Sequence, residues 1–163
     1  MPDSAKTYSD PPGMPEDERM TDAEFKVIRE HLGLSAPWLA AHLGVSERTV
    51  RHWEQGRYPI PDGVRLELED LEKHTGAFLD GVIPKILDMP EPGILTYRTD
   101  DEYHAAQPEI DFPASWHRAV CARIAQEVPA LSIAYAEQRE PNFVRLGDKT
   151  VLLPGTYKPG PGR

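Results

Sequence analysis

The chain has very little cysteine and no long apolar run. Cys121 is the one cysteine among 163 residues, which excludes an intrachain disulfide and any zinc site built from several cysteines. No apolar run approaches the roughly 18 residues of a membrane-spanning helix, and the N-terminal segment lacks the hydrophobic stretch of a secretory signal. We therefore expect a cytoplasmic protein with no membrane partner, no metal site and no cofactor.

The sequence also lacks an excess of positive charge, since its formal net charge is −9. A protein that coats nucleic acid without regard to sequence binds through electrostatic attraction to phosphates, so this charge argues against that class. Sequence-specific DNA binding needs only a local basic face. The distribution of the charges is therefore more informative than their sum.

Three short helices are predicted in the first half of the chain, and capping residues mark their starts. Thr21 and Glu24 have the spacing of a capping box, in which each side chain satisfies the free backbone N–H of the other residue. Ser35 and Ser46 are the expected N-caps of the next two helices. Gly44 lies in the few residues between these two helices, as the connection in a helix-turn-helix requires.

A fourth, longer helix is expected from Asp62 onwards, because apolar residues there recur near a 3.5-residue period. Gly76, Gly81 and Pro84 are expected to kink or end it. The helical domain is therefore predicted to span residues 20–88.

The rest of the chain predicts a small α+β domain at residues 94–153. Short strands are expected near 94–99 and 131–137, and a hairpin at 143–153. Residues 1–19 are expected to form a disordered, acidic, Pro-rich arm, and residues 154–163 a disordered tail, because neither segment shows apolar periodicity.

An apolar stripe runs along the helix predicted between these strands. Trp116, Val120, Ile124 and Val128 recur every four residues, which places them on one helix face. This stripe is too apolar to stay exposed in a small domain. We therefore expect it to form the interface of a homodimer.

The stretch from Leu32 to Pro61 carries a resemblance to a known family. Its motifs are Leu-Gly-Leu at 32–34, Leu-Gly-Val-Ser at 43–46, and Trp-Glu-x-Gly at 53–56 followed by prolines. These resemble the lambda-repressor/Cro-like helix-turn-helix regulators. The resemblance implies a mainly α protein, with a lambda-repressor-like DNA-binding domain followed by the small α+β dimerisation domain.

In that family the third helix enters the major groove of double-stranded DNA. The residues that the resemblance assigns to DNA contact are Glu47, Arg48, Thr49, Arg51, His52, Gln55, Arg57 and Tyr58. Glu47, Arg48 and His52 match base-contacting positions, where arginine pairs with guanine and glutamate with cytosine. The competing interpretation is that all eight are ordinary solvated surface residues.

Two further positions follow from the same resemblance. Arg29 and Glu54 match an ion pair that relatives hold beneath the recognition helix, although they could also be independent surface residues. Ala36 departs from the pattern, because many relatives carry a glutamine there that touches phosphate. We therefore expect the second helix to contact the DNA phosphates only through the backbone N–H groups at its N-terminus.

A narrower resemblance links the second half to the YdiL-type and anti-CRISPR-associated repressors. Its matching residues are Tyr97, Asp101, Glu102, Tyr103 and Trp116. It implies transcriptional repression by a dimer on an inverted-repeat operator, including the operator of the protein's own operon.

Two other classes of protein are alternatives to a DNA-binding regulator. An antitoxin-type protein would use residues 89–163 to bind a partner protein and the helix-turn-helix only for autoregulation. An enzyme would need a catalytic constellation. His117 and Cys121, four residues apart, could suggest a nucleophile pair or half a metal site. Such lone pairs usually pack in a core, so we expect no catalytic residues.

Overall fold

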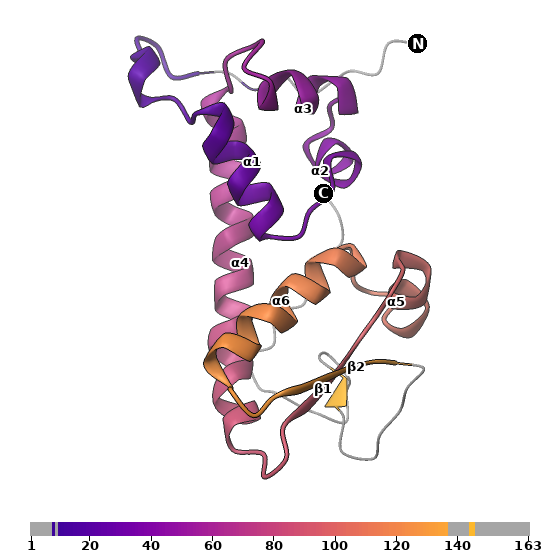
Figure 1. Cartoon of the computed structure of the whole chain (residues 1–163). Coiled ribbons are helices and arrows are strands. Elements are labelled where there is room, and N and C mark those ends of the chain that lie inside the picture. Colours follow the sequence, from indigo (N-terminus) through magenta and orange to yellow (C-terminus); the bar gives the residue numbers. More distant parts are fainter. Residues whose placement is uncertain (1–7, 9, 137–143, 146–163) are drawn as a thin grey trace. The chain divides into compact units, whose positions relative to one another are not determined.

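The computed structural model describes residue 8, residues 10–136 and residues 144–145 (Figure 1). The chain divides into two compact units, Met1–Lys73 and His74–Arg163, and each is described by itself. Most of the predicted hairpin and all of the predicted tail at 154–163 lie outside the described residues.

The described part of the chain contains one 3-10 helix, six α-helices and three strands. Their bounds are η1 Glu16–Glu18, α1 Asp22–His31, α2 Ala36–Leu43, α3 Glu47–Glu54, α4 Asp62–Leu87, β1 Gly93–Thr96, α5 Asp100–Ala106, α6 Ala114–Glu127, β2 Ser132–Tyr135 and β3 Val144–Arg145. The mainly helical fold class is confirmed, with a helix-turn-helix in the first unit and a small sheet in the second.

In the first unit the helices begin where the capping residues predict. Thr21 and Glu24 form both bonds of the capping box, and the Ser35 and Ser46 hydroxyls accept from backbone N–H groups three residues on. Gly44 has a φ of 69°, the left-handed conformation that lets α2 end and α3 turn away. The buried core consists mainly of Phe25, Leu32, Leu34, Leu39, Leu43, Val50, Trp53, Ile60, Val64, Leu68 and Leu71.

The N-terminal arm differs from the prediction of disorder over residues 1–19. Within its described part, η1 forms, and Asp10 and Arg19 bind each other and backbone groups of residues 60–62. The prediction is wrong for this part because it considered only local apolar periodicity. Polar anchors that reach about fifty residues along the chain leave no local pattern.

Helix α4 is also longer than predicted, because it continues through Gly76, Gly81 and Pro84. Pro84 lies in the last turn, where a proline removes only one of the final hydrogen bonds of the helix. Phe78, Val82 and Ile86 remain buried along this stretch. The division between the two units falls within α4, after Lys73, and not at the predicted boundary of residue 88.

The second unit contains a parallel sheet with strand order β2-β1-β3. Ile94 of β1 is in register with Ile133 of β2 and Val144 of β3. Parallel strands need a crossover connection, and α5 and α6 provide it between β1 and β2. Residues 144–145 of the predicted hairpin therefore pair with β1 as a parallel strand.

The apolar stripe of α6 lies in the core of the second unit, so its assignment to a dimer interface is wrong. Trp116, Val120, Ile124 and Val128 are between 0% and 4% exposed within the single chain. The Trp116 ring stacks on Phe112 at 4.2 Å between centroids. Periodicity identified a buried face correctly, but it could not show that the same chain covers that face.

Replacing Ile124 tests this core assignment. Because Ile124 is 0% exposed, Ile124→Ala should lower the free energy of unfolding by about 2–5 kcal/mol in a urea titration. Leu87→Ala removes a side chain of the same size at a residue that is 55% exposed, and it should cost less than about 1 kcal/mol. If Ile124→Ala changed the oligomeric state and not the stability, the stripe would be an interface after all.

Candidate nucleic-acid interface

Helix α3 is held in place by its inner face. Val50 and Trp53 are 0% and 5% exposed, and the Trp53 ring meets Phe25 of α1 edge-on at 5.9 Å between centroids. At the start of α3 the Ser46 hydroxyl accepts from the Thr49 backbone N–H at 3.1 Å. The opposite face of the helix is consequently turned outward.

The eight residues predicted to contact DNA all lie on this outward face or just after α3. Arg48, Arg51, Gln55, Arg57 and Tyr58 are exposed, and the other three, Glu47, Thr49 and His52, are partly exposed. The predicted set therefore lies at least partly exposed on the stretch formed by α3 and the residues just after it. Three of its members are arginines, so this stretch is a local basic face on an acidic chain.

Two contacts organise that face in the free protein. Arg51 and Glu47 form an ion pair across one helical turn. The rings of His52 and Tyr58 meet edge-on at 5.1 Å between centroids, which links the segment after α3 to the helix. A carboxylate has two acceptor oxygens, so Glu47 can hold Arg51 and still accept a further hydrogen bond.

The ion pair that the resemblance predicts is present beneath α3. Arg29 Nε lies 2.5 Å from Glu54 Oε1, and the two side chains are only 12% and 13% exposed. Arg29 Nη1 also donates to the Leu34 carbonyl at 2.9 Å. This guanidinium therefore ties α1 to α3 and to the connection that precedes α2.

Helix α2 has contacts that the sequence analysis missed. The Trp38 and His42 rings stack with a centroid distance of 5.1 Å and an angle of 10°. His42 Nε2 lies 3.7 Å from Glu67 Oε2 of α4. The i, i+4 spacing of Trp38 and His42 was the available signal, since residues four apart share a helix face.

His117 and Cys121 lie in the second unit, and both side chains are buried. His117 Nδ1 is 2.8 Å from Thr96 Oγ1 and 3.6 Å from Cys121 Sγ. Burial lowers the pKa of His117 to about 3 and raises the pKa of Cys121 to about 12. At neutral pH the thiol therefore stays protonated and the imidazole neutral, which favours packing over nucleophilic chemistry.

Among the described residues, no cluster of three or more His, Cys, Asp or Glu side chains could hold a metal ion. None of the described helices is long and apolar enough to span a membrane.

This geometry defines a helix-turn-helix DNA-binding domain, and a family model described as "Helix-turn-helix domain" matches residues 23–76. The chain is also 33% identical over 113 residues to the Aca2 repressor of Pectobacterium phage ZF40. The aligned region covers 69% of this chain and 91% of that protein. The chain therefore belongs to the family of helix-turn-helix transcriptional regulators that includes this repressor. The resemblance to helix-turn-helix transcriptional regulators noted in the sequence is confirmed.

A double-mutant cycle tests the ion pair beneath α3. Arg29→Ala or Glu54→Ala alone should each lower the free energy of unfolding by about 3–5 kcal/mol, because each leaves a largely buried charge without its partner. The double variant should lose clearly less than the sum of the two. The Glu47–Arg51 pair, with side chains 39% and 64% exposed, is the matched control and should couple by only about 0.3–0.5 kcal/mol. Equal coupling energies in both pairs would refute a special role for Arg29 and Glu54.

Proposed function

We propose that this protein is a transcriptional repressor that binds an inverted-repeat operator as a homodimer. The observation that carries the proposal is the outward face of α3, which presents Arg48 and Arg51. The opposite face of α3, with Val50 and Trp53, is packed in the core and forms what we call the seat of α3. The name of the phage relative, the Aca2 repressor, favours repression over activation. Autorepression of the protein's own gene is the simplest form of this activity.

The exposed face of α3 suggests how the work is divided between base and phosphate contacts. Arg48 is exposed in the N-terminal half of α3, the half that enters the major groove in this class of domain. There its guanidinium can donate two bonds to one guanine. Arg57 and Tyr58 follow the helix and are suited to phosphates, as are Arg51 and Gln55 at the edge of the face.

Two arginine variants separate these roles. Arg48→Ala should weaken operator binding by roughly 1–3 kcal/mol and relax the preference at one base position, because a bidentate base contact is lost. Arg57→Ala should weaken binding to all sequences alike and reduce the salt slope by about one unit. A binding selection over randomised DNA, repeated at several salt concentrations, measures both effects. An unchanged base preference in Arg48→Ala would refute the assignment of α3 as the recognition helix.

Dimerisation must use a surface other than the stripe of α6. Among the described residues, β2 lies at the edge of the sheet, and its Ile133 is 42% exposed. An edge strand with an exposed apolar residue is a common site of association. This observation supports the second unit as the part of the chain through which two copies associate.

The operator provides the decisive test of the dimer. Two recognition helices enter the same side of B-DNA only when their half-sites are about 10 base pairs apart, or a multiple of that. A footprint upstream of the protein's own gene should therefore reveal an inverted repeat with that spacing. Inserting about five base pairs between the half-sites turns one of them to the opposite side, so affinity should fall towards that of a single half-site. If affinity survived the insertion, the symmetric dimer would be wrong.

Repression itself is tested with the same DNA. A reporter gene placed behind the footprinted promoter should be silenced by the wild-type chain and released by Arg48→Ala. Activation of that reporter, or no effect on it, would contradict the proposed function.

A further inference from the structure

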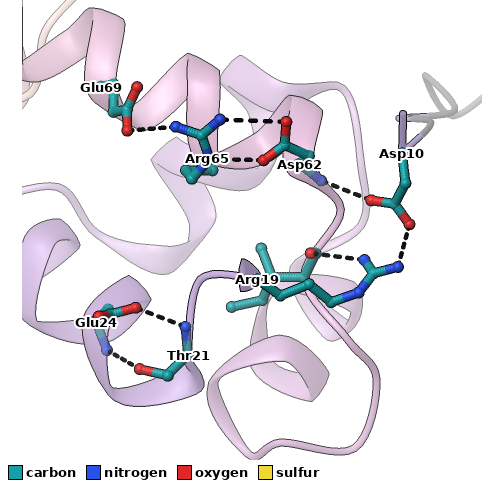
Figure 2. Close-up of polar contacts among 8 residues, drawn as sticks. Asp10, Arg19, Thr21, Glu24, Asp62, Arg65 and Glu69 are labelled. Atoms are coloured by element: carbon teal, nitrogen blue, oxygen red, sulfur yellow. Dashed lines mark hydrogen bonds and ion pairs between the residues drawn. The ribbon is translucent and has the colours of Figure 1, made fainter. Parts of the chain in front are cut away.

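The described part of the N-terminal arm, Tyr8 and residues 10–19, is fastened to the first unit by polar contacts; we call it the N-terminal strap. Figure 2 shows Asp10 between Arg19 and the start of α4. Asp10 Oδ2 lies 2.5 Å from Arg19 Nη2, and Asp10 Oδ1 accepts from the Asp62 backbone N–H at 2.9 Å. One carboxylate thus binds two partners that are 9 and 52 residues away.

The contact with Asp62 supplies a cap that the neighbouring sequence does not. Asp62 is the first residue of α4, and the first N–H groups of a helix have no partner within it. Pro61, just before the helix, carries no side-chain acceptor. The carboxylate of Asp62 is engaged by Arg65, which also binds Glu69 (Figure 2). Asp10 therefore caps α4 from a distant part of the chain.

Arg19 fastens the residue that precedes this helix start. Its Nη1 donates to the Ile60 carbonyl at 3.3 Å. Ile60 is 2% exposed, so its side chain anchors the same point from the inside. The strap therefore holds residues 60–62 through two backbone groups.

Residues 60–62 form the C-terminal end of the segment between α3 and α4 that carries Arg57 and Tyr58. The N-terminal end of this segment is fixed by the Arg57 backbone N–H, which donates to the His52 carbonyl at 2.9 Å. Gly56 there has a φ of +68°, and a Cβ at this position would lie 2.9 Å from Asp22 Oδ2. The N-terminal end of the segment thus depends on α3 and Gly56, whereas its C-terminal end depends on the strap.

Tyr8 provides a further anchor. Its hydroxyl donates to the Leu43 carbonyl, at the end of α2, at 2.7 Å. Its ring covers Gly63, where a Cβ would come within 2.9 Å of Tyr8 Cδ1. The strap therefore spans from the end of α2, where the helix-turn-helix turns, to the start of α4.

The composition of the strap argues against a direct contact with DNA. Asp10, Glu16, Asp17 and Glu18 would be repelled by phosphates. The Arg19 guanidinium, with help from the Asp62 backbone N–H, holds the pKa of Asp10 below its usual range, so this carboxyl stays ionised at neutral pH. Any contribution of the strap to DNA binding must act through the residues that it holds.

We propose that the N-terminal strap is a positioning element of the DNA interface, in which Asp10 and Arg19 hold the 57–58 segment in the geometry that phosphate contact needs. The proposal rests on the proposed function, because it assigns Arg57 and Tyr58 to phosphates. Asp10 and Arg19 are positioning residues and touch no DNA. The strap thereby becomes part of the DNA-binding domain, which the helix-turn-helix pattern alone would begin near residue 20.

Hydrogen exchange in the free, full-length protein tests the fastening without DNA. Asp10→Ala should speed exchange of the Asp62 amide by about threefold to tenfold, the effect of losing one helix-capping hydrogen bond. Asp17→Ala is the matched control, because it removes the same charge from an exposed position in η1, and it should leave the exchange unchanged. If Asp10→Ala does not fold, Asp10→Asn carries the comparison. Equal exchange in both variants and the wild type would overturn the strap.

Operator binding by the same full-length variants tests the positioning role. Asp10→Ala should weaken binding by about threefold to tenfold with the base preference unchanged and a lower salt slope, as expected when a phosphate contact is lost. Asp10→Asn keeps an acceptor for the Asp62 N–H and should restore part of the affinity. In a chain that already carries Arg57→Ala and Tyr58→Ala, Asp10→Ala should have little further effect, because the groups it positions are gone.

The outcomes distinguish this proposal from the proposed function. If the wild type binds its operator and Asp10→Ala binds equally well, only the strap proposal is overturned. A full additional loss in the Arg57→Ala, Tyr58→Ala background would also overturn it, since Asp10 would then act elsewhere. If the wild type itself binds no operator, the proposed function fails, and the positioning role fails with it whatever the exchange data show.

Discussion

The arrangement of the first unit depends on the ion pair between Arg29 and Glu54. Both side chains are largely buried, and a buried charge without a partner is strongly destabilising. Arg29 also binds the Leu34 carbonyl, so one guanidinium connects α1, α3 and the chain between α1 and α2. Because α3 is only eight residues long, it can bury only a small apolar surface against its neighbours. Its orientation is set by this pair and by the apolar seat of Trp53.

Ion pairing also explains how an acidic chain can present a basic face. Several acidic side chains of the first unit are matched with arginines: Asp10 with Arg19, Glu54 with Arg29, and Asp62 and Glu69 with Arg65. A close pair of opposite charges has a weak field beyond a few ångströms, particularly in physiological salt. The net charge of −9 therefore overstates the repulsion that DNA would meet at α3.

Helix-capping contacts between residues close together in the sequence were predicted correctly, whereas contacts between distant residues were mostly missed. The caps at Thr21 and Ser46 act over three residues, and their spacing was visible at once. The Arg29–Glu54 pair spans 25 residues and could be expected only from the family resemblance. Asp10 reaches across 52 residues from a Pro-rich segment that looked disordered. The stripe around Trp116 shows a different limit, because periodicity reveals a buried face without revealing what covers it.

The contacts of the first unit separate two requirements of a DNA-binding protein. Reading a base through a bidentate arginine demands a closely fixed geometry. If α3 reads bases as proposed, buried packing and a buried ion pair contribute by fixing the backbone of this helix. Contact with phosphates is less exacting, since phosphates carry no sequence information. On the proposed function, those contacts come from Arg57 and Tyr58, which the partly exposed strap holds at one end. Specificity and affinity would then rest on different sets of contacts, so that changes in the strap alter how tightly the protein binds without altering which sequence it reads.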